Sequence, residues 1–217
     1  MRPAPPGAHL KSAAALAVLA LALLAFAVLV ADLRYNGPIT RADEPISKWT
    51  HDRMSEPLTS FLIVVTHLHG TLAIGLMALA AGAALAWQRQ WAWLAALVLS
   101  VPGGLLLNAG LKQVFQRIRP VGESPLLALA SYSFPSGHTA GATVWWGFVA
   151  ILCFAWHPGL GRRAMAVALT AVMIGLTALS RVYLGVHYPS DVLAAVAEGT
   201  AWLALCFLAL GLRERYR

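Results

Sequence analysis

Long apolar runs, separated by short polar segments, fill most of this chain of 217 residues. A helix needs about 20 apolar residues to cross a bilayer, and several runs reach this length, at residues 10–31, 91–111, 137–156, 164–183 and 189–212. A longer run, residues 58–87, exceeds one ordinary span, and Gly70 divides it into a short re-entrant or interfacial helix and a span that begins at Thr71. The pattern predicts an all-α, polytopic membrane protein with six transmembrane helices in a single domain, residues 1–217.

Two polar segments are predicted to lie outside the membrane. Residues 32–57 carry mixed charge and several turn residues, and a short helix is expected around residues 45–54. Residues 121–134 form a second polar loop. The first apolar run follows the basic residues Arg2 and Lys11, so a secretory signal peptide is an alternative to a span. The run exceeds the roughly 7–15 residues of a signal-peptide core, which favours a retained span.

Composition supports the membrane assignment. Hydrophobic residues make up 59% of the chain and charged residues 12%, which is half of the ~25% that soluble domains carry. The net charge is +7, but the basic residues stand at the ends of apolar runs rather than in patches interleaved with exposed aromatic residues. That distribution argues against a nucleic-acid partner. Cys153 and Cys206 lie inside apolar runs and are expected to be free thiols.

The basic residues also predict the orientation of the spans. With six spans, both termini, the turn at Arg89 and the turn at Arg162 and Arg163 fall on one side of the membrane, and short basic connections mark the cytoplasmic side. The opposite side carries as many Lys and Arg residues, but acidic residues of the long first loop offset them. This orientation places three polar motifs together at the outer face of the membrane.

The first motif follows the apolar run at residues 91–111. Lys112 and Arg119 are seven positions apart, so on a helix they share nearly one face. A planar guanidinium fork and a compact ammonium group both suit phosphate oxygens. The alternative is a basic anchor whose side chains snorkel toward the membrane surface. Arg117 falls on another face and is expected to face solvent or lipid headgroups.

The second motif is Pro-Ser-Gly-His at residues 135–138, where a polar loop becomes an apolar helix. Ser136 is expected to cap the helix, and Gly137 lets the backbone approach a ligand closely. The first N–H groups of the helix would face an anion. His138 would then stand beside a bound phosphate, able to protonate a leaving oxygen. A plain helix cap with an interfacial histidine is the alternative.

The third motif joins Ser180 and Arg181 to His187 and Asp191. Pro189 suits the first turn of a helix, so Asp191 falls in that turn and His187 lies just before it. A carboxylate that binds one imidazole nitrogen fixes the tautomer and leaves the other nitrogen free to attack. Arg181 can reach the same anion across a short turn. The alternative is a capped helix with a hydrogen-bonded histidine.

Four further polar residues stand within apolar runs. His67 and His69 flank the break at Gly70, and we expect interfacial histidines, with a metal-binding pair as the alternative. Asn108 lies one turn before Lys112 and is expected either to support that lysine or to join two helices by a hydrogen bond. Glu198 is an intramembrane acid, a type of residue that marks functional sites, and protonation or pairing with a neighbouring helix is its alternative.

The three motifs together resemble the signature of the type 2 phosphatidic acid phosphatase (PAP2) superfamily, which includes bacterial membrane lipid phosphatases, acid phosphatases and vanadium haloperoxidases. That signature is Lys, six residues and Arg-Pro; then Pro-Ser-Gly-His; then Ser-Arg, five residues, His, three residues and Asp. Every position matches here, across about residues 112–191. The resemblance implies a PAP2/haloperoxidase-like helical core.

The resemblance also implies a role for each matched residue. His187 would be the nucleophile that forms a phosphohistidine, Asp191 would orient it, and His138 would be the general acid. The phosphoryl oxygens would be bound by five residues: Lys112, Arg119, Ser136, Gly137 and Arg181. No metal and no other cofactor is implied.

The expected protein is therefore a lipid phosphatase of the bacterial inner membrane, with its site facing the periplasm and no protein partner required. Undecaprenyl diphosphate is the first substrate candidate, because an outward-facing enzyme of this size suits lipid-carrier recycling. Phosphatidylglycerol phosphate, phosphatidic acid and lipid A phosphates are the alternatives. Phosphotransfer to a lipid or sugar acceptor is another enzymatic alternative. A lipid-binding or transport protein that uses the same cations without turnover is the non-enzymatic one.

Overall fold

In a computed structural model of the protein, eight α-helices account for most of the described residues, which are 6–120, 131–157 and 159–215. In chain order they are α1 (Pro6–Arg34), α2 (Pro38–His51), α3 (Glu56–Leu68), α4 (Thr71–Trp87), α5 (Trp91–Phe115), α6 (Gly137–Trp156), α7 (Leu160–Tyr183) and α8 (Pro189–Arg215). These described residues contain no β-strand, so the all-α expectation is confirmed. Most of the second polar loop, up to residue 130, lies outside them.

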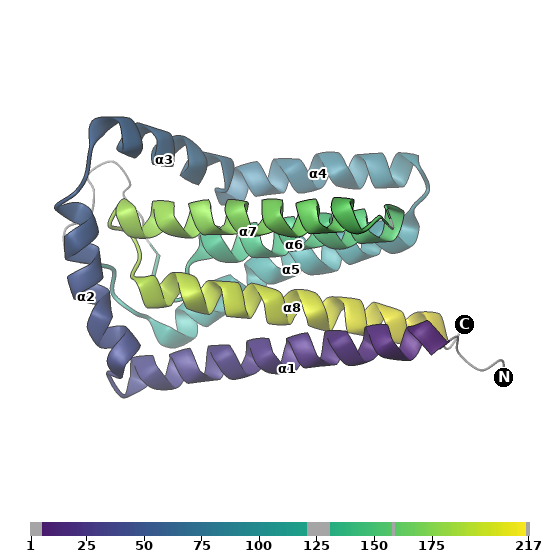
Figure 1. Cartoon of the computed structure of the whole chain (residues 1–217), viewed down its shortest axis with the longest axis horizontal. Helices are drawn as coiled ribbons and strands as arrows, with labels where there is room; N and C mark the ends of the chain where they lie inside the picture. Colours follow the sequence, from purple (N-terminus) through teal and green to yellow (C-terminus); the bar gives the residue numbers. More distant parts are fainter. Residues whose placement is uncertain (1–5, 121–130, 158, 216–217) are drawn as a thin grey trace.

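The long helices run side by side along the long axis of the molecule, and α2 lies across one end of the bundle (Figure 1). Five of them, α1 and α5 to α8, are long and apolar enough to cross a membrane. The sixth candidate span is the pair α3 and α4, which is bent by 47° at the short break around Gly70. The predicted division at Gly70 is confirmed, and the span count is six when the bent pair is counted as one.

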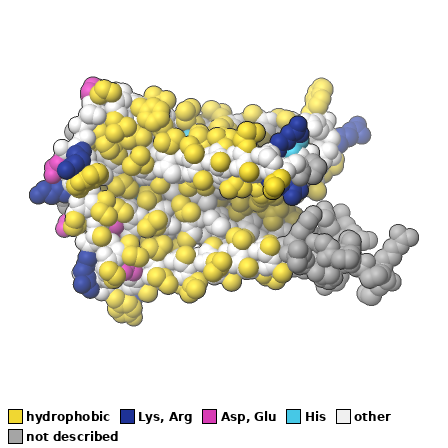
Figure 2. Space-filling model, in the orientation of Figure 1, with side chains coloured by type: hydrophobic (Ala, Val, Ile, Leu, Met, Phe, Trp, Pro, Cys, Tyr) yellow, Lys and Arg dark blue, Asp and Glu magenta, His cyan; other side chains and the backbone are white. Residues whose placement is uncertain are grey.

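The surface of the bundle is apolar along its flanks, as a lipid-facing surface requires because hydrocarbon offers no hydrogen-bond partners. Leu21, Leu72 and Leu106 are among the large hydrophobic side chains that are exposed there. In the view of Figure 2, Lys and Arg side chains stand at both ends of the bundle, whereas Asp and Glu gather at the end that carries α2. This charge pattern divides the molecule into an apolar belt and two polar ends.

Small residues let the central helices approach one another closely. A Cβ atom on Gly199 of α8 would lie 2.9 Å from the Cβ atom of Thr143 on α6, and one on Gly103 of α5 would lie 2.8 Å from the Trp202 ring on α8. Contacts this short require glycine, which is a common device where membrane helices cross. The resulting frame fixes the ends of α5, α6 and α8 relative to one another.

The first polar segment is more helical than the sequence predicted. We expected a helix around residues 45–54, but α2 already begins at Pro38. The carboxylate of Asp32, near the end of α1, accepts hydrogen bonds from the backbone N–H of Ile39 at 3.2 Å and of Thr40 at 2.7 Å. These bonds satisfy donors that the first turn of a helix leaves unpaired, and proline is favoured in that turn.

Candidate active site

Four helix ends meet at the end of the bundle where α2 lies (Figure 1): the ends of α5 and α7 and the beginnings of α6 and α8. The predicted site residues lie at or next to these ends. In chain order they are Lys112 and Arg119 at the end of α5, Ser136, Gly137 and His138 at the start of α6, Arg181 at the end of α7, and His187 and Asp191 at the start of α8. Residues far apart in the sequence are thereby brought into one region.

His187 and Asp191 form a buried pair. The Nδ1 atom of His187 lies 3.3 Å from Oδ2 of Asp191, and Asp191 is completely buried. The same oxygen accepts hydrogen bonds from the Tyr188 N–H at 2.9 Å and from the hydroxyl of Ser133. The tight turn before His187 requires a φ of 68° at Gly185, a conformation that glycine adopts without strain. The carboxylate at Nδ1 favours a proton on that nitrogen and leaves the lone pair on Nε2.

Arg119 lies on the other side of the imidazole. Its Nη1 atom is 3.2 Å from Nε2 of His187 and donates to the carbonyl oxygen of Val186 at 2.6 Å. Its Nε atom donates to the carbonyl oxygen of Ser131 at 2.8 Å. Lys112 is held nearby, because its Nζ atom donates to the carbonyl oxygen of Tyr132 at 2.6 Å. Backbone carbonyls of the segment before α6 therefore hold both cations, and Arg119 is the one that lies at Nε2 of His187.

Among the described residues, Arg181 is the largest side chain that is almost fully buried, with a relative exposure of 1%. Its Nη1 atom donates to the hydroxyl of Thr66 on α3. Its Nε and Nη2 atoms have no hydrogen-bond partner among the described residues. A buried polar group without a partner costs about 1–3 kcal/mol, and more when it is charged. An anion that accepts from these two groups would remove that cost.

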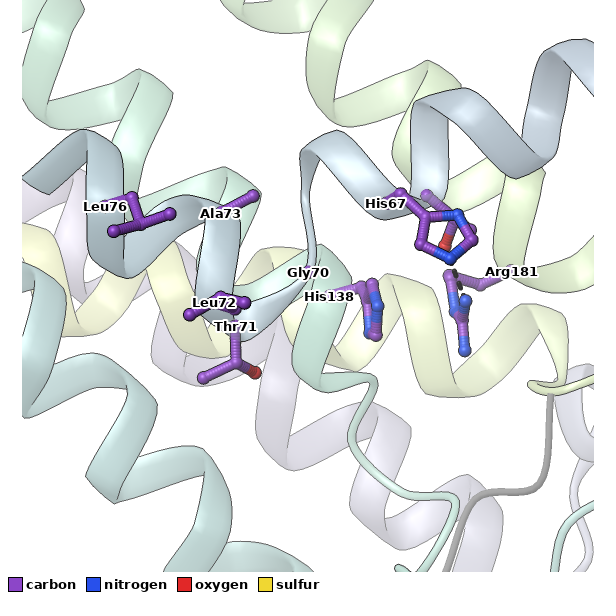
Figure 3. A pocket seen from close by; sticks show the side chains of 9 residues that line it. His67, Gly70, Thr71, Leu72, Ala73, Leu76, His138 and Arg181 are labelled. Atoms are coloured by element: carbon purple, nitrogen blue, oxygen red, sulfur yellow. Dashed lines mark hydrogen bonds between the residues drawn. The ribbon is translucent and has the colours of Figure 1, made fainter.

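A cavity of about 320 Å³ opens beside Arg181, at the break between α3 and α4. Figure 3 shows Arg181 and His138 next to each other on one side of it, with His67 close to the arginine. The opposite part of the lining is apolar and comes from α4, including Leu72 and Leu76. The cavity thus combines a cationic end with an apolar wall that continues onto the lipid-facing surface.

The start of α6 is packed tightly against α5 and α8. A Cβ atom on Gly137 would lie 3.2 Å from Oδ1 of Asn108 and 3.7 Å from Cε of Lys112. The backbone N–H of Ser136 donates to the carbonyl oxygen of Asp191 at 3.1 Å. Ser136 occupies the N-cap position as predicted, but its hydroxyl lies 3.1 Å from the hydroxyl of Thr139 and makes no capping bond.

The protonation state of His187 follows from its surroundings. Burial lowers the pKa of its imidazole to about 3, and the positive charges of Arg119 and Arg181 act in the same direction, while Asp191 opposes them. The ring is therefore neutral near pH 7. A neutral ring is what a nucleophile needs, because protonation of Nε2 would remove the attacking lone pair.

The prediction for Arg117 is wrong. Its side chain has a relative exposure of 13% and pairs with two buried carboxylates, Asp191 at 2.6 Å and Asp43 at 2.7 Å. The predicted face assumed that the helix continues through this residue, but α5 ends at Phe115 and Gln116 adopts a left-handed conformation with a φ of 47°. The chain therefore turns, and Arg117 points toward the start of α8.

The remaining polar candidates have structural partners. His69 is buried, with Nδ1 2.9 Å from the Val65 carbonyl oxygen and Nε2 accepting from the Trp146 indole at 3.0 Å, so it is not the interfacial residue that we expected. Asn108 donates to Glu198 at 2.9 Å, which matches the alternative of a hydrogen bond between two helices. His67 lines the cavity. Sequence reasoning missed Thr66, Ser131 and Ser133, which have no motif of their own.

Similarity to known proteins covers most of the chain. The family model of the PAP2 superfamily matches residues 91–215. Phosphatidylglycerophosphatase B of Bacillus subtilis (strain 168) is 33% identical over 196 residues, which is 89% of this chain and 94% of that protein. A putative undecaprenyl-diphosphatase of Escherichia coli (strain K12) is 34% identical over 116 residues, 52% of this chain and 53% of that one.

The fold is similar as well. The crystal structure of a transmembrane PAP2-type phosphatidylglycerolphosphate phosphatase from Bacillus subtilis superposes with a TM-score of 0.80 at 30% identity, and the match covers 92% of this chain and 97% of that one. The apolar helices of the present structure agree with such a membrane environment. The chain therefore belongs to the PAP2 superfamily and is a multi-pass membrane phosphatase.

Proposed function

We propose that the protein removes the terminal phosphate of a membrane lipid through a covalent phosphohistidine at His187. The observation that carries this proposal is the arrangement around the imidazole, with Asp191 at Nδ1 and Arg119 at Nε2. Such a ring is oriented, neutral and adjacent to a cation that can bind a phosphoryl oxygen. These are the requirements of a nitrogen nucleophile that attacks phosphorus.

The reaction has two in-line steps. In the first, Nε2 of His187 forms a bond to phosphorus while the bond to the lipid oxygen breaks, and His138 transfers its proton to that oxygen. In the second, a water molecule gives a proton to His138 and attacks phosphorus, the N–P bond breaks, and inorganic phosphate leaves. His138 is thus general acid and then general base. Asp191 stabilises the positive charge that His187 acquires in the first step.

Charge neutralisation accounts for the other residues of the site. Phosphoryl transfer depends mainly on positioning and on stabilising the charge of the equatorial oxygens. Arg181 has two buried donors without partners among the described residues, Arg119 lies beside the imidazole, and Lys112 is held by the carbonyl oxygen of Tyr132. The N-terminus of α6 adds backbone N–H groups at Gly137 and the positive end of a helix dipole. Ser136 lies at this N-terminus and completes the set.

A lipid substrate fits the cavity better than a soluble phosphate ester would. The phosphate would lie at Arg181 and His138, and the first part of the chain would lie along Leu72 and Leu76. Phosphatidylglycerol phosphate is the first substrate to test, because relatives that are similar over most of the chain are named as phosphatases of this lipid. Undecaprenyl diphosphate, the first candidate from the sequence, is the second, supported by the similarity to the Escherichia coli protein.

The basic connections support an orientation with the site at the outer face of the inner membrane. The turns at Arg89 and at Arg162 and Arg163 lie at the end of the bundle opposite to α2. A substrate that reaches the site must therefore be present in the outer leaflet. Both candidate lipids satisfy this condition once they have been transferred across the bilayer.

A phosphate-release assay on the purified full-length protein in detergent micelles tests the proposal. The panel contains phosphatidylglycerol phosphate, undecaprenyl diphosphate, phosphatidic acid and a lipid A phosphate, and His187→Ala is the control. We expect release from at least one lipid and none from the variant at the same folded concentration. Release by His187→Ala at the wild-type rate would refute the nucleophile. Recovery of the labelled phosphate on an added lipid or sugar alcohol would indicate phosphotransfer instead of hydrolysis.

A further inference from the structure

Arg117 joins two buried carboxylates that belong to different parts of the chain. Its Nη1 atom donates to Oδ1 of Asp191 at 2.6 Å, and its Nη2 atom donates to Oδ2 of Asp43 on α2 at 2.7 Å. Relative exposures of the Asp43 and Asp191 side chains are 2% and 0%. A buried ion is stable only when it is paired and hydrogen-bonded, so these three side chains depend on one another.

Asp43 also binds the start of α8. Its Oδ1 atom accepts a hydrogen bond from the backbone N–H of Ser190 at 2.9 Å, and its Oδ2 atom accepts one from the Ser190 hydroxyl. That hydroxyl in turn accepts from Nη1 of Arg117 at 2.7 Å. The Arg117 guanidinium further lies over the ring of Tyr188, 4.2 Å from its centroid. The turn between His187 and Asp191 is therefore held from the α2 side by both residues.

This arrangement gives the two oxygens of Asp191 different partners. Oδ1 accepts from Arg117, whereas Oδ2 faces Nδ1 of His187 and also accepts from the Tyr188 N–H and the Ser133 hydroxyl. The guanidinium therefore opposes rotation of the carboxylate that would withdraw Oδ2 from the imidazole.

We infer that Arg117 and Asp43 are positioning residues for the phosphohistidine reaction, acting through Asp191 on the direction of His187. This inference rests on the function proposed above. It assigns a catalytic purpose to α2, which lies outside the candidate spans, and to a residue between the two matched positions Lys112 and Arg119. Neither residue touches the reacting phosphorus.

The competing explanation is that Asp43 only attaches α2 to the bundle. Asp32 supplies the matched control, because its carboxylate also binds α2, through the N–H groups of Ile39 and Thr40, but at the junction with α1. Asp32→Asn and Asp43→Asn each remove one negative charge and keep the side-chain shape. If attachment of α2 were the whole role, the two variants would have similar effects on turnover.

The experiment measures kcat, KM and the rate of phosphohistidine formation in a single turnover, with the lipid that the wild-type protein hydrolyses best. For Asp43→Asn and Arg117→Lys we expect kcat and the single-turnover rate to fall on the order of 10- to 100-fold, as for a small misplacement of a reacting group. KM should stay near the wild-type value, and Asp32→Asn should retain wild-type kcat. Equal losses in Asp32→Asn and Asp43→Asn would overturn the inference.

A double-mutant cycle supplies a measurement that a merely structural role would not change. In an Asp191→Asn background, Arg117→Lys should cause no further loss of kcat, because its partner carboxylate is already gone. Additive losses would contradict an effect through Asp191.

Thermal melting in detergent identifies variants that fail to fold. If Asp43→Asn does not fold, Arg117→Lys still tests the inference, because it keeps the positive charge between the two carboxylates. Wild-type protein without phosphatase activity would refute the proposed function itself, whereas active wild type with unaffected Arg117 and Asp43 variants would refute only this inference.

Discussion

The Nη1 atom of Arg119 lies 3.2 Å from Nε2 of His187, so the cation stands where phosphorus would approach in the proposed reaction. In the substrate-free protein this guanidinium is also held by the carbonyl oxygens of Val186 and Ser131. A phosphoryl oxygen can replace the imidazole as the partner of Nη1 while the other two bonds persist. Binding of the substrate would then release Nε2 of His187 from Arg119. At the same time, Arg119 would neutralise negative charge on the phosphoryl group.

Arg119→Lys tests this exchange. An ammonium group keeps the charge but cannot reproduce a fork that binds two carbonyls and an anion together. We expect kcat/KM for the lipid substrate to fall on the order of 100-fold, the loss that follows removal of one transition-state donor. Arg41→Lys is the matched control, because Arg41 is an exposed arginine of α2 that donates to the carbonyl oxygen of Asn36. Comparable kinetics for the Arg119 and Arg41 variants would rule out the exchange.

Arg181→Met should separate stability from activity. Two buried donors of Arg181 lack partners among the described residues. Removing them relieves a cost, so the substrate-free variant should unfold at a higher temperature, corresponding to on the order of 1 kcal/mol. Phosphate release should be lost, because the donors proposed to bind the phosphoryl oxygens are gone. Differential scanning fluorimetry in detergent and the release assay measure the two quantities. A lower melting temperature would show that Arg181 is satisfied in the free protein.

Vanadate should inhibit the protein and raise its melting temperature. Five-coordinate vanadate resembles the phosphoryl transition state, and such analogues bind on the order of 10²-fold or more tightly than substrates. Stabilisation of the folded protein by the bound anion follows from mass action. His187→Ala should lose most of this stabilisation, because it lacks the nitrogen that occupies the apical position. The idea fails if vanadate stabilises the variant and the wild type equally.

The low pKa of His187 predicts how stability depends on pH. The folded protein keeps this imidazole neutral down to about pH 3, whereas in the unfolded chain the imidazole takes up a proton near its ordinary pKa of 6.5. Stability is therefore lost as pH falls below about 6, by about 1.4 kcal/mol per pH unit from this one group. The melting temperature of wild type should fall more steeply between pH 7 and pH 5 than that of His187→Gln. Parallel curves would contradict a buried neutral ring.

The sequence was sufficient to predict the helices and the matched motifs for local reasons. Apolar runs long enough to cross a bilayer can only be helices or parts of a barrel, and Gly70 marked the break between α3 and α4. Ser136 and Asp191 were assigned to helix starts because capping and proline signals lie within a few residues. These inferences needed no information about distant parts of the chain.

The contacts of Arg117 and Asp43 could not be predicted in the same way. The two residues are 74 positions apart, and their pairing depends on α5 ending before Arg117 and on the way α2 crosses the end of the bundle. Charged residues in a polar loop are usually solvated, so nothing in the local pattern distinguished Asp43. The state of Arg181 could not be predicted for a similar reason, because only the packed structure shows that two of its donors are buried without a partner among the described residues.

The beginning of α1 and the end of α8 lie together at the end of the bundle opposite to α2 (Figure 1). A fluorescent protein or an affinity tag fused next to the beginning of α1 or the end of α8 would therefore stand a full membrane thickness, about 30 Å, from the proposed catalytic groups. Immobilisation through such a tag would leave the end of the bundle that carries α2 accessible to vesicles and to inhibitors. The fold thus offers two attachment points for biophysical work that do not compete with the lipid headgroup.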